Sequence, residues 1–239
     1  MKSRVFKHFF TVLALLLSAS AYAYSDTVRS TLIGLSDFRE IRPNIYVSPN
    51  TNSSHEQAII TLISHARLRI TEQFGPPTST PKIIFLKGKE EEESFKLYQA
   101  PGKVLIAPWG NYLILNQTLV NIDVAAHELI HAEIAERLGY LTRMRTMPTW
   151  LDEGIALQVD HRARYSNLAT IDDTELKRIA SLVTPKLFWT QNPEQNIKNY
   201  QSSKVAVRQT VLPAIREKGL YAILDKMKNG TKIDAIMEN

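Results

Sequence analysis

The sequence predicts an α+β domain, with a small mixed sheet and a helix in the first half and mostly helices in the second half. Three observations support this fold class. Short apolar runs bounded by turn residues are confined to the part before Leu119, and helical periodicity dominates from there to the end. No Pro/Gly-rich linker divides the chain. Strands first and helices afterwards are typical of one α+β domain.

Residues 1–23 have the pattern of a signal peptide. Basic residues (Lys2, Arg4, Lys7) precede a short apolar run from Phe9 to Leu17, and Ala21-Tyr22-Ala23 fits the small-residue cleavage rule. A retained anchor is the alternative, but a spanning helix needs about 20 apolar residues and this run is shorter. We therefore expect export to a bacterial periplasm or medium, without stable membrane insertion after cleavage.

Cleavage would leave residues 24–239 as one domain, with a sheet-rich part (24–118) and a helical part (119–239). The formal charge of +5 includes three basic residues of the leader, so the mature chain carries about +2 (5 − 3). With so small a charge and no recognition motif, we expect no nucleic-acid partner. The absence of cysteine excludes disulfides, thiolate ligands and a cysteine nucleophile, so a bound metal would need His, Asp or Glu.

The first half predicts a strand, a helix and further strands. Asn44–Ser48 reads as a short strand. Ser53 and Glu56 form a capping box for an amphipathic helix that Gly75-Pro76-Pro77 ends. The apolar residues of this helix recur at helical spacing (Ile59, Leu62, Ile63, Ala66, Ile70 and Phe74). His55 and His65, on or beside it, are read as surface or packing residues.

Three more strands are expected before the helical half. Lys82–Leu86 is a buried strand, and Lys89–Lys96, with four consecutive glutamates, is a solvated helical or loop face. Val104–Ala107 and Tyr112–Leu115 are two strands joined by a turn around residues 108–110. Tyr112–Leu115 is either the sheet edge that pairs with an extended substrate or an ordinary core strand.

The strongest signal is the H-E-x-x-H run from His127 to His131. Residues four apart lie on one helix face, so both imidazoles can reach one metal ion. Glu128 is placed to take a proton from metal-bound water. Asn121 suits the N-cap and Gly139 the position after the last turn. The alternative is two surface histidines on an ordinary helix, and the apolar neighbours argue against it.

A third ligand is expected downstream. A metzincin is excluded, because Ile134 and Arg137 occupy its glycine and third-histidine positions. The segment PTWLDEGIA (148–156) predicts a second helix and offers Glu153, 22 residues after the motif. Its small residues, Gly154 among them, would let this helix approach the first one closely.

The pair AHELIHA and PTWLDEGIA resembles the signature of the gluzincins, in particular the small bacterial peptidase-MA-like domains. The resemblance covers roughly residues 120–237. It implies a zincin-like fold and a zinc ion (Zn2+) held by His127, His131 and Glu153, with Glu128 as general base. The stretch NYQSS (199–203) resembles the family's helix start and implies Tyr200 as the residue that stabilises the oxyanion.

One departure concerns the side chains that orient the ligands. Thermolysin-type enzymes carry an aspartate four residues after the glutamate ligand, where this chain has Leu157. Asp152 and Asp160 are the possible replacements. For the oxyanion, His161 and Tyr165 are candidates after Tyr200, the alternative for each being a packing or surface role. Arg143, Arg145, Arg162 and Arg164 either bind an acidic substrate or a carboxyl terminus, or are simply solvated.

These expectations combine into an exported zinc-dependent metallopeptidase that hydrolyses peptide bonds of a peptide or protein substrate, with its oligomeric state left open. A second hypothesis is a catalytically inactive zincin-fold protein with a periplasmic binding or assembly role. A third is an envelope-associated factor that hydrolyses one specific partner. The second hypothesis predicts a lost ligand or glutamate, and the sequence retains them all.

Overall fold

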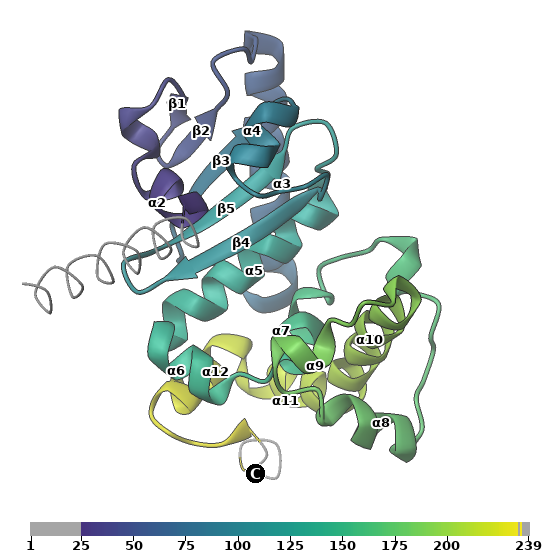
Figure 1. The fold of residues 1–239 in the computed structure, drawn as a ribbon. Helices are drawn as coiled ribbons and strands as arrows, with labels where there is room; N and C mark the ends of the chain where they lie inside the picture. The colour runs from purple at the N-terminus through teal and green to yellow at the C-terminus, as the bar shows by residue number, and fades with distance from the viewer. Residues whose placement is uncertain (1–24, 234, 236–239) are drawn as a thin grey trace, which may run out of the picture.

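A computed structural model describes residues 25–233 and 235 of the chain (Figure 1). The predicted signal peptide lies outside this range. The described part contains one five-stranded mixed sheet and many helices, which confirms the α+β class. None of its helices combines the length and the apolar character needed to cross a membrane.

The sheet has parallel strands at its centre and antiparallel strands at both edges. The strand order is β1-β2-β3-β5-β4. Strands β2, β3 and β5 run parallel, whereas β1 and β4 pair antiparallel with β2 and β5. The strands are β1 (Arg39–Arg42), β2 (Ile45–Val47), β3 (Lys82–Leu86), β4 (Gly102–Ala107) and β5 (Gly110–Asn116).

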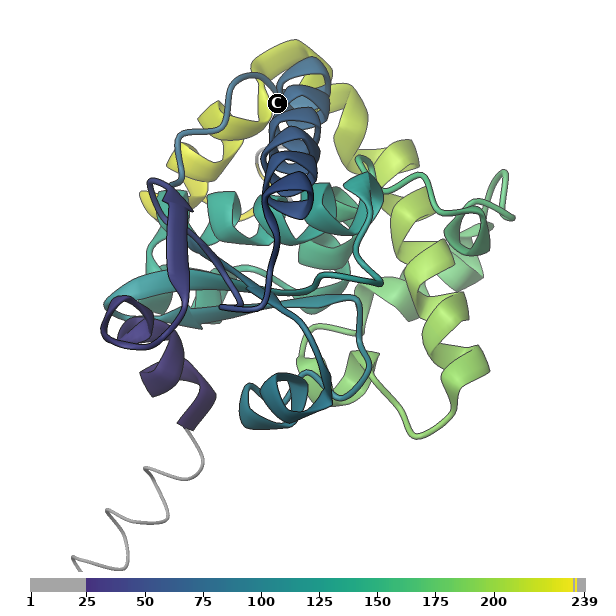
Figure 2. The same cartoon turned by 90° about the horizontal axis from the view of Figure 1, so that it is seen from above.

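Helices cover both faces of the sheet, so its central strands are apolar on both sides. Ile83 and Phe85 of β3 face the larger core, together with α3 (Ser53–Phe74) and α5 (Ile122–Leu138). Ile84 and Leu86 face a smaller core on the other side. Figure 2 shows α3 on one side of the sheet, and α2 (Ser25–Thr31) and α4 (Lys89–Ser94) on the other.

Most elements predicted in the first half are present, with three omissions and one wrong cap. Helix α2, the 3-10 turn η1 (Ile33–Leu35) and strand β1 were not predicted: all three are short, and α2 and β1 are also polar in sequence. The capping box at Ser53 is wrong: Asn52 is the N-cap of α3, and its side chain accepts a hydrogen bond from the His55 backbone. Helix α3 ends before Gly75, as predicted.

The glutamate run forms α4, but it is not uniformly solvated. Glu91 accepts hydrogen bonds from the Ser48 hydroxyl and the Lys87 backbone, at 2.6 and 2.7 Å. Glu92 accepts one from Asn116 Nδ2 at 2.8 Å. Two of the four glutamates therefore tie α4 to the ends of β2, β3 and β5.

The strand at the sheet edge beside α5 is β4, and β5 lies inside the sheet between β3 and β4. The hypothesis that Tyr112–Leu115 forms the edge is therefore wrong, and its core-strand alternative is confirmed. The β4–β5 hairpin itself was predicted. The local sequence does not show which strand pairs with the other side of β5, and in the structure that strand is β3.

The second half consists of helices. They are α6 (Tyr140–Thr146), α7 (Thr149–Ala156), the 3-10 turn η2 (Ala163–Tyr165), α8 (Asp173–Ala180), α9 (Pro185–Phe188), α10 (Pro193–Ala206), the π-helical segment η3 (Val207–Val211), α11 (Leu212–Lys218) and α12 (Leu220–Lys228). Of these, α6, α7 and α12 contact α5, and the others pack mainly on these or on one another. Helix α7 lies between α5 and α10 and contacts both.

Two expectations for this half are corrected. A Cβ atom at Gly154 would lie 2.6 Å from the Ser203 carbonyl oxygen and 2.5 Å from Val207 Cγ2. Gly154 therefore allows a close approach to α10 and η3, and not to α5. Tyr200 does not open a helix: α10 begins at Pro193 with Asn192 as its N-cap, so Tyr200 lies in the middle of it.

Candidate metal centre

The two histidines of the H-E-x-x-H run lie on one face of the buried helix α5. Asn121 is the N-cap, accepting a hydrogen bond from the Val124 backbone, and the helix ends at Gly139 in a positive-φ conformation, as the sequence predicts. His127 and His131 are 6% and 4% exposed, and their Nε2 atoms are 3.1 Å apart. The helix therefore delivers two imidazole nitrogens to one buried point.

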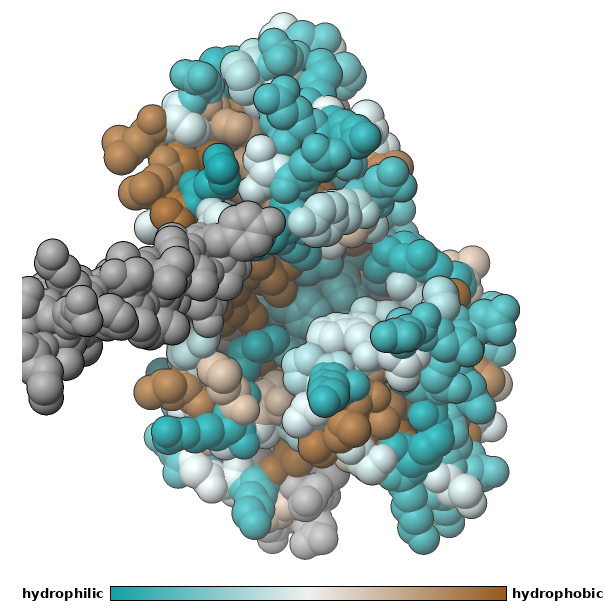
Figure 3. Space-filling view, in the orientation of Figure 1, coloured by the Kyte–Doolittle hydropathy of each residue, from teal (hydrophilic) through white to brown (hydrophobic). Residues whose placement is uncertain are grey.

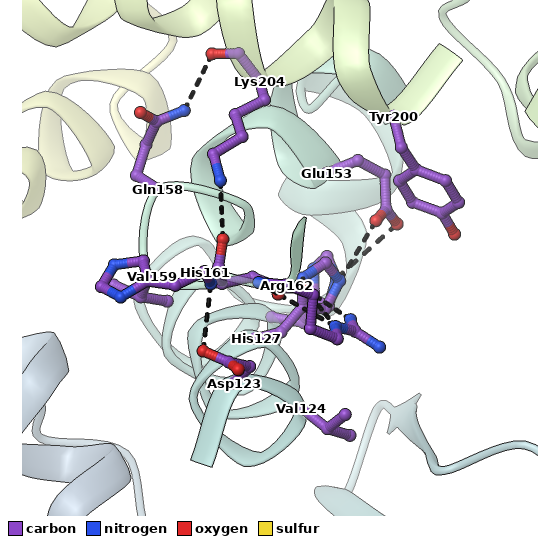
Figure 4. Close-up of polar contacts among 12 residues, drawn as sticks. Asp123, Val124, His127, Glu153, Gln158, Val159, His161, Arg162, Tyr200 and Lys204 are labelled. Carbon is purple, nitrogen blue, oxygen red and sulfur yellow. Dashed lines mark hydrogen bonds and ion pairs between the residues drawn. The ribbon is translucent and has the colours of Figure 1, made fainter. Parts of the chain in front are cut away.

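Glu153 on α7 supplies a carboxylate to the same point. Its Oε2 lies 3.3 Å from His127 Nε2, and its Oε1 lies 3.6 Å from His131 Nε2. The three ligand atoms all fall within 4.8 Å of one another. Figure 4 shows Glu153 reaching from α7 to His127. The buried His127-His131-Glu153 group can thus hold a metal ion.

The spacing of these atoms fits a tetrahedral metal. With metal–ligand bonds of about 2.1 Å, two tetrahedral ligands are roughly 3.4 Å apart. His127 Nε2 lies 3.1 Å from His131 Nε2 and 3.3 Å from Glu153 Oε2, close to that value, while His131 Nε2 lies 3.6 Å from the other carboxylate oxygen, Oε1. Glu153 Oε2 is also buried without a hydrogen-bond partner among the described residues. An unpaired buried carboxylate oxygen is costly, and a bound cation would satisfy it.

Each histidine has its own aspartate at the Nδ1 atom. Asp152 Oδ1 lies 2.8 Å from His131 Nδ1. Asp160 Oδ2 lies 3.4 Å from His127 Nδ1, an electrostatic contact without hydrogen-bond geometry. Carboxylates at Nδ1 orient an imidazole so that Nε2 faces the metal. The sequence suggested Asp152 and Asp160 as possible orienting residues without assigning either to a histidine. In the structure Asp152 lies beside His131 and Asp160 beside His127.

Two arginines hold these aspartates in turn. Arg143 pairs with Asp152 Oδ2. Arg162 Nε donates to both oxygens of Asp160, at 2.9 and 3.0 Å. Asp160 is fully buried and Asp152 nearly so. Neither pairing was predicted from the sequence, which offered only the clustering of four arginines around the motifs.

The acid–base state of the group reflects its crowding with opposite charges. Burial alone would lower the pKa of His131, but Asp152 and Glu153 outweigh it and raise that pKa well above its ordinary value. Burial likewise opposes ionisation of Glu153, yet the two histidines hold its pKa far below its usual range. The centre therefore favours a positive charge between the imidazoles and the carboxylate, which a metal ion supplies in place of protons.

Glu128 lies between α5 and the edge strand β4. A Cβ atom at Gly102 would come within 3.4 Å of Glu128 Cγ and 3.0 Å of Val124 Cγ1, so the strand approaches the helix closely there. Burial raises the pKa of Glu128 above its ordinary value. A carboxylate with a raised pKa beside the two histidines is suited to accept and return a proton.

Tyr200 and Tyr165 lie near the centre, and His161 does not contribute its side chain. Tyr200 belongs to α10 and is drawn beside Glu153 in Figure 4; burial, and then the Glu153 charge, raise its pKa well above the usual value. Its hydroxyl oxygen accepts a hydrogen bond from Trp189 Nε1 at 2.8 Å, and its ring packs on Tyr165. The His161 side chain is exposed. Trp189 was not anticipated from the sequence.

A cleft opens beside the centre. Figure 3 shows the surface hollowed between the sheet-containing part and the helical part. A cavity of about 410 Å³ there reaches His131 and Glu153. Its walls are largely apolar and come from the edge strand and from the helical half, with Val104, Ile106, Met144, Met147, Val183 and Trp189 among the lining residues.

Comparison with models of known protein families, with curated proteins and with solved structures finds no match for this chain.

Proposed function

We propose that this chain is an exported zinc-dependent peptidase with a zincin-like fold. The observation that carries the proposal is the convergence of His127, His131 and Glu153 on one buried point, with ligand atoms within 4.8 Å of one another and an aspartate behind each histidine. Two imidazoles and one carboxylate leave a fourth position open, as catalytic zinc sites do and structural sites do not. A zinc ion bound there supplies a Lewis acid that lowers the pKa of water to about 7.

Glu128 is the residue that moves protons in this proposal. Its raised pKa brings it nearer to the working range of a general base. It accepts the proton of the attacking water and later delivers it to the nitrogen of the leaving amine. The edge strand β4 supports the substrate, because its free side offers backbone N–H and C=O groups to an extended peptide.

Tyr200 is proposed to donate a hydrogen bond to the carbonyl oxygen as negative charge develops on it. Trp189 donates to the Tyr200 hydroxyl oxygen, which leaves the Tyr200 proton free to point elsewhere. Tyr165 packs on the Tyr200 ring and fixes its position.

Metal content of the purified chain tests the centre. We expect about one zinc per chain, lost in Glu153→Ala and retained in His65→Ala, which removes an exposed histidine of α3. Absence of zinc from the unmodified protein, or its persistence in Glu153→Ala, would contradict the three-ligand centre.

Hydrolysis of a mixed peptide library tests the chemistry separately. Glu128→Gln should keep its zinc and lose hydrolysis, whereas Glu136→Gln, an exposed glutamate further along the same helix, should keep both. Zinc binding without any hydrolysis in the unmodified chain would favour the non-catalytic binding role instead.

A further inference from the structure

The four arginines near the motifs have different environments. Arg143 and Arg162 are paired with Asp152 and Asp160. The Arg145 side chain is exposed on α6. The guanidinium of Arg164 stacks on the Tyr165 ring at 4.6 Å, and no carboxylate pairs with it among residues 25–233. Arg164 is thus a cation near the centre whose charge is not neutralised by a partner.

Arg164 and Arg162 line a shallow cavity of about 460 Å³. Its other walls are Pro101, Leu119, Asn121, Val124 and Ala163. The lining includes no acidic residue, and the Asp160 carboxylate behind it is already matched by Arg162. Within the lining itself, the positive charge of Arg164 is therefore not offset by a carboxylate, although Glu128 nearby acts on Arg162. An unmatched positive charge favours an anionic group.

The cavity adjoins the candidate metal centre on the side of Glu128. Val124, which lines it, is three residues before His127 and contacts the same point of β4 as Glu128 does. Figure 4 draws Arg162 beside His127, and Val124 lies on the same helix as His127. The apolar cavity of about 410 Å³ lies at the other end of the cleft, around His131 and Glu153.

Two arguments fix which end of a peptide would meet the Arg164 cavity. Glu128 must protonate the leaving amine, and that amine belongs to the residue on the C-terminal side of the cleaved bond. The part of the substrate on the C-terminal side of the cleaved bond therefore lies next to Glu128. A peptide that pairs antiparallel with β4 has the same orientation. Its C-terminal part lies near Pro101, which precedes β4 and lines the Arg164 cavity, and its N-terminal part lies near Val104 and Ile106, which line the apolar cavity.

We propose that the cavity lined by Arg164 and Arg162 binds a carboxylate of the substrate, immediately C-terminal to the cleaved bond, and that Arg164 sets this specificity. The proposal rests on the proposed peptidase function. The carboxylate belongs either to an Asp or Glu side chain or to the end of the peptide chain. The apolar cavity at the other end takes an apolar side chain on the N-terminal side of the bond.

Arg164 is exposed, so its pairing with a carboxylate is partly screened by water, and we expect about tenfold in affinity. The first experiment measures binding to the zinc-loaded Glu128→Gln protein, which binds without cleaving. Three otherwise identical short peptides are compared: one with Glu after an apolar residue and an amidated end, one with Gln there and an amidated end, and one ending in Gln with a free carboxylate.

The expected result is about tenfold tighter binding of one or both carboxylate peptides than of the neutral one. A second substitution, Arg164→Gln, should remove this difference, Arg164→Lys should keep much of it, and Arg145→Gln is the matched control that should leave it unchanged. Tighter binding of the Glu peptide alone indicates a side-chain site, and tighter binding of the free-end peptide alone indicates recognition of a chain end. Equal affinity for all three peptides would overturn the proposal.

The second experiment maps cleavage positions in a peptide library by mass spectrometry. We expect acidic residues, or chain ends, just after the cut sites, and Arg164→Glu should shift the preference toward Lys and Arg. Cleavage with no such preference overturns the carboxylate site and leaves the peptidase function standing. If Glu128→Gln binds carboxylate peptides more tightly but the unmodified protein cleaves no peptide, the carboxylate site is supported and the peptidase function is contradicted.

Discussion

Substituting Gly154 by alanine tests whether the packing of α7 against α10 positions Glu153, the proposed metal ligand. Gly154 follows Glu153 directly, and its missing side chain is what allows α10 to lie so close. A Cβ atom there would come 2.6 Å from the Ser203 carbonyl oxygen, where ordinary contacts begin at 3.4 Å. A backbone carbonyl cannot rotate away, so the two helices would have to separate by about 0.8 Å.

The expected loss of stability combines two opposing effects. Replacing glycine by alanine inside a helix stabilises it by about 1 kcal/mol. Forcing an extra methyl into a packed interface costs about 1–3 kcal/mol, and contact with both a backbone oxygen and Val207 Cγ2 places this site at the upper end. We expect a net loss of about 2 kcal/mol, which corresponds to a decrease of roughly 4–8 °C in Tm for a chain of this size.

Urea unfolding of the metal-free protein measures the stability, and competition with a chelator measures zinc affinity. Because Glu153 moves with α7, zinc affinity should also fall, by about tenfold. Gly34→Ala is the control, since its Cβ would meet only the Tyr46 hydroxyl at an ordinary 3.7 Å. If Gly154→Ala were as stable as the unmodified protein with unchanged zinc affinity, the close α7–α10 contact would not determine the position of Glu153.

Three further predictions concern the surroundings of the centre. Asp152→Asn and Asp160→Asn should each weaken zinc binding by about 10- to 100-fold in chelator competition, because each carboxylate orients one histidine, while exposed Asp173→Asn should not; unchanged affinity would show that the aspartates do not orient the ligands. Burial alone would raise the pKa of Glu133, but hydrogen bonds from Ser79, Arg137 and Thr78 hold it below the ordinary 4.5. The stability from Glu133 is therefore present above pH 4.5 and lost as pH falls through its lowered pKa, and Glu133→Gln should cost about 3 kcal/mol at neutral pH and flatten this acid dependence in urea unfolding; an unaltered acid profile would contradict the assignment. Tyr200→Phe keeps the ring contacts and should lower kcat about a hundredfold with little change in KM or stability. A rise in KM with kcat unchanged would instead assign Tyr200 to substrate binding.

The sequence predicted the elements whose signals are local. The buried helix from Ile122 to Leu138 has its cap, its apolar positions and its terminal glycine within one stretch of chain, so the H-E-x-x-H geometry follows from helix periodicity alone. Strand β3 was predicted with its observed limits because a run of apolar residues buried on both faces is a distinctive pattern. The polar strand β1 and helix α2 carry no such pattern and were not predicted.

The sequence by itself thus determined that two imidazoles share one face of a buried helix, and it offered Glu153 as their partner. Tertiary packing decided the rest of the centre. Asp152 is the direct neighbour of Glu153 on α7, and Asp160 lies beyond the end of that helix, so helix periodicity does not predict where either carboxylate lies. Only the docking of α7 on α5 brings each aspartate to its own histidine. Strand order made β4 the edge, and the loop after α7 set Arg164 beside the cleft. Such contacts depend on how separate elements pack against one another. The periodicity of residues within one helix or strand does not determine that packing.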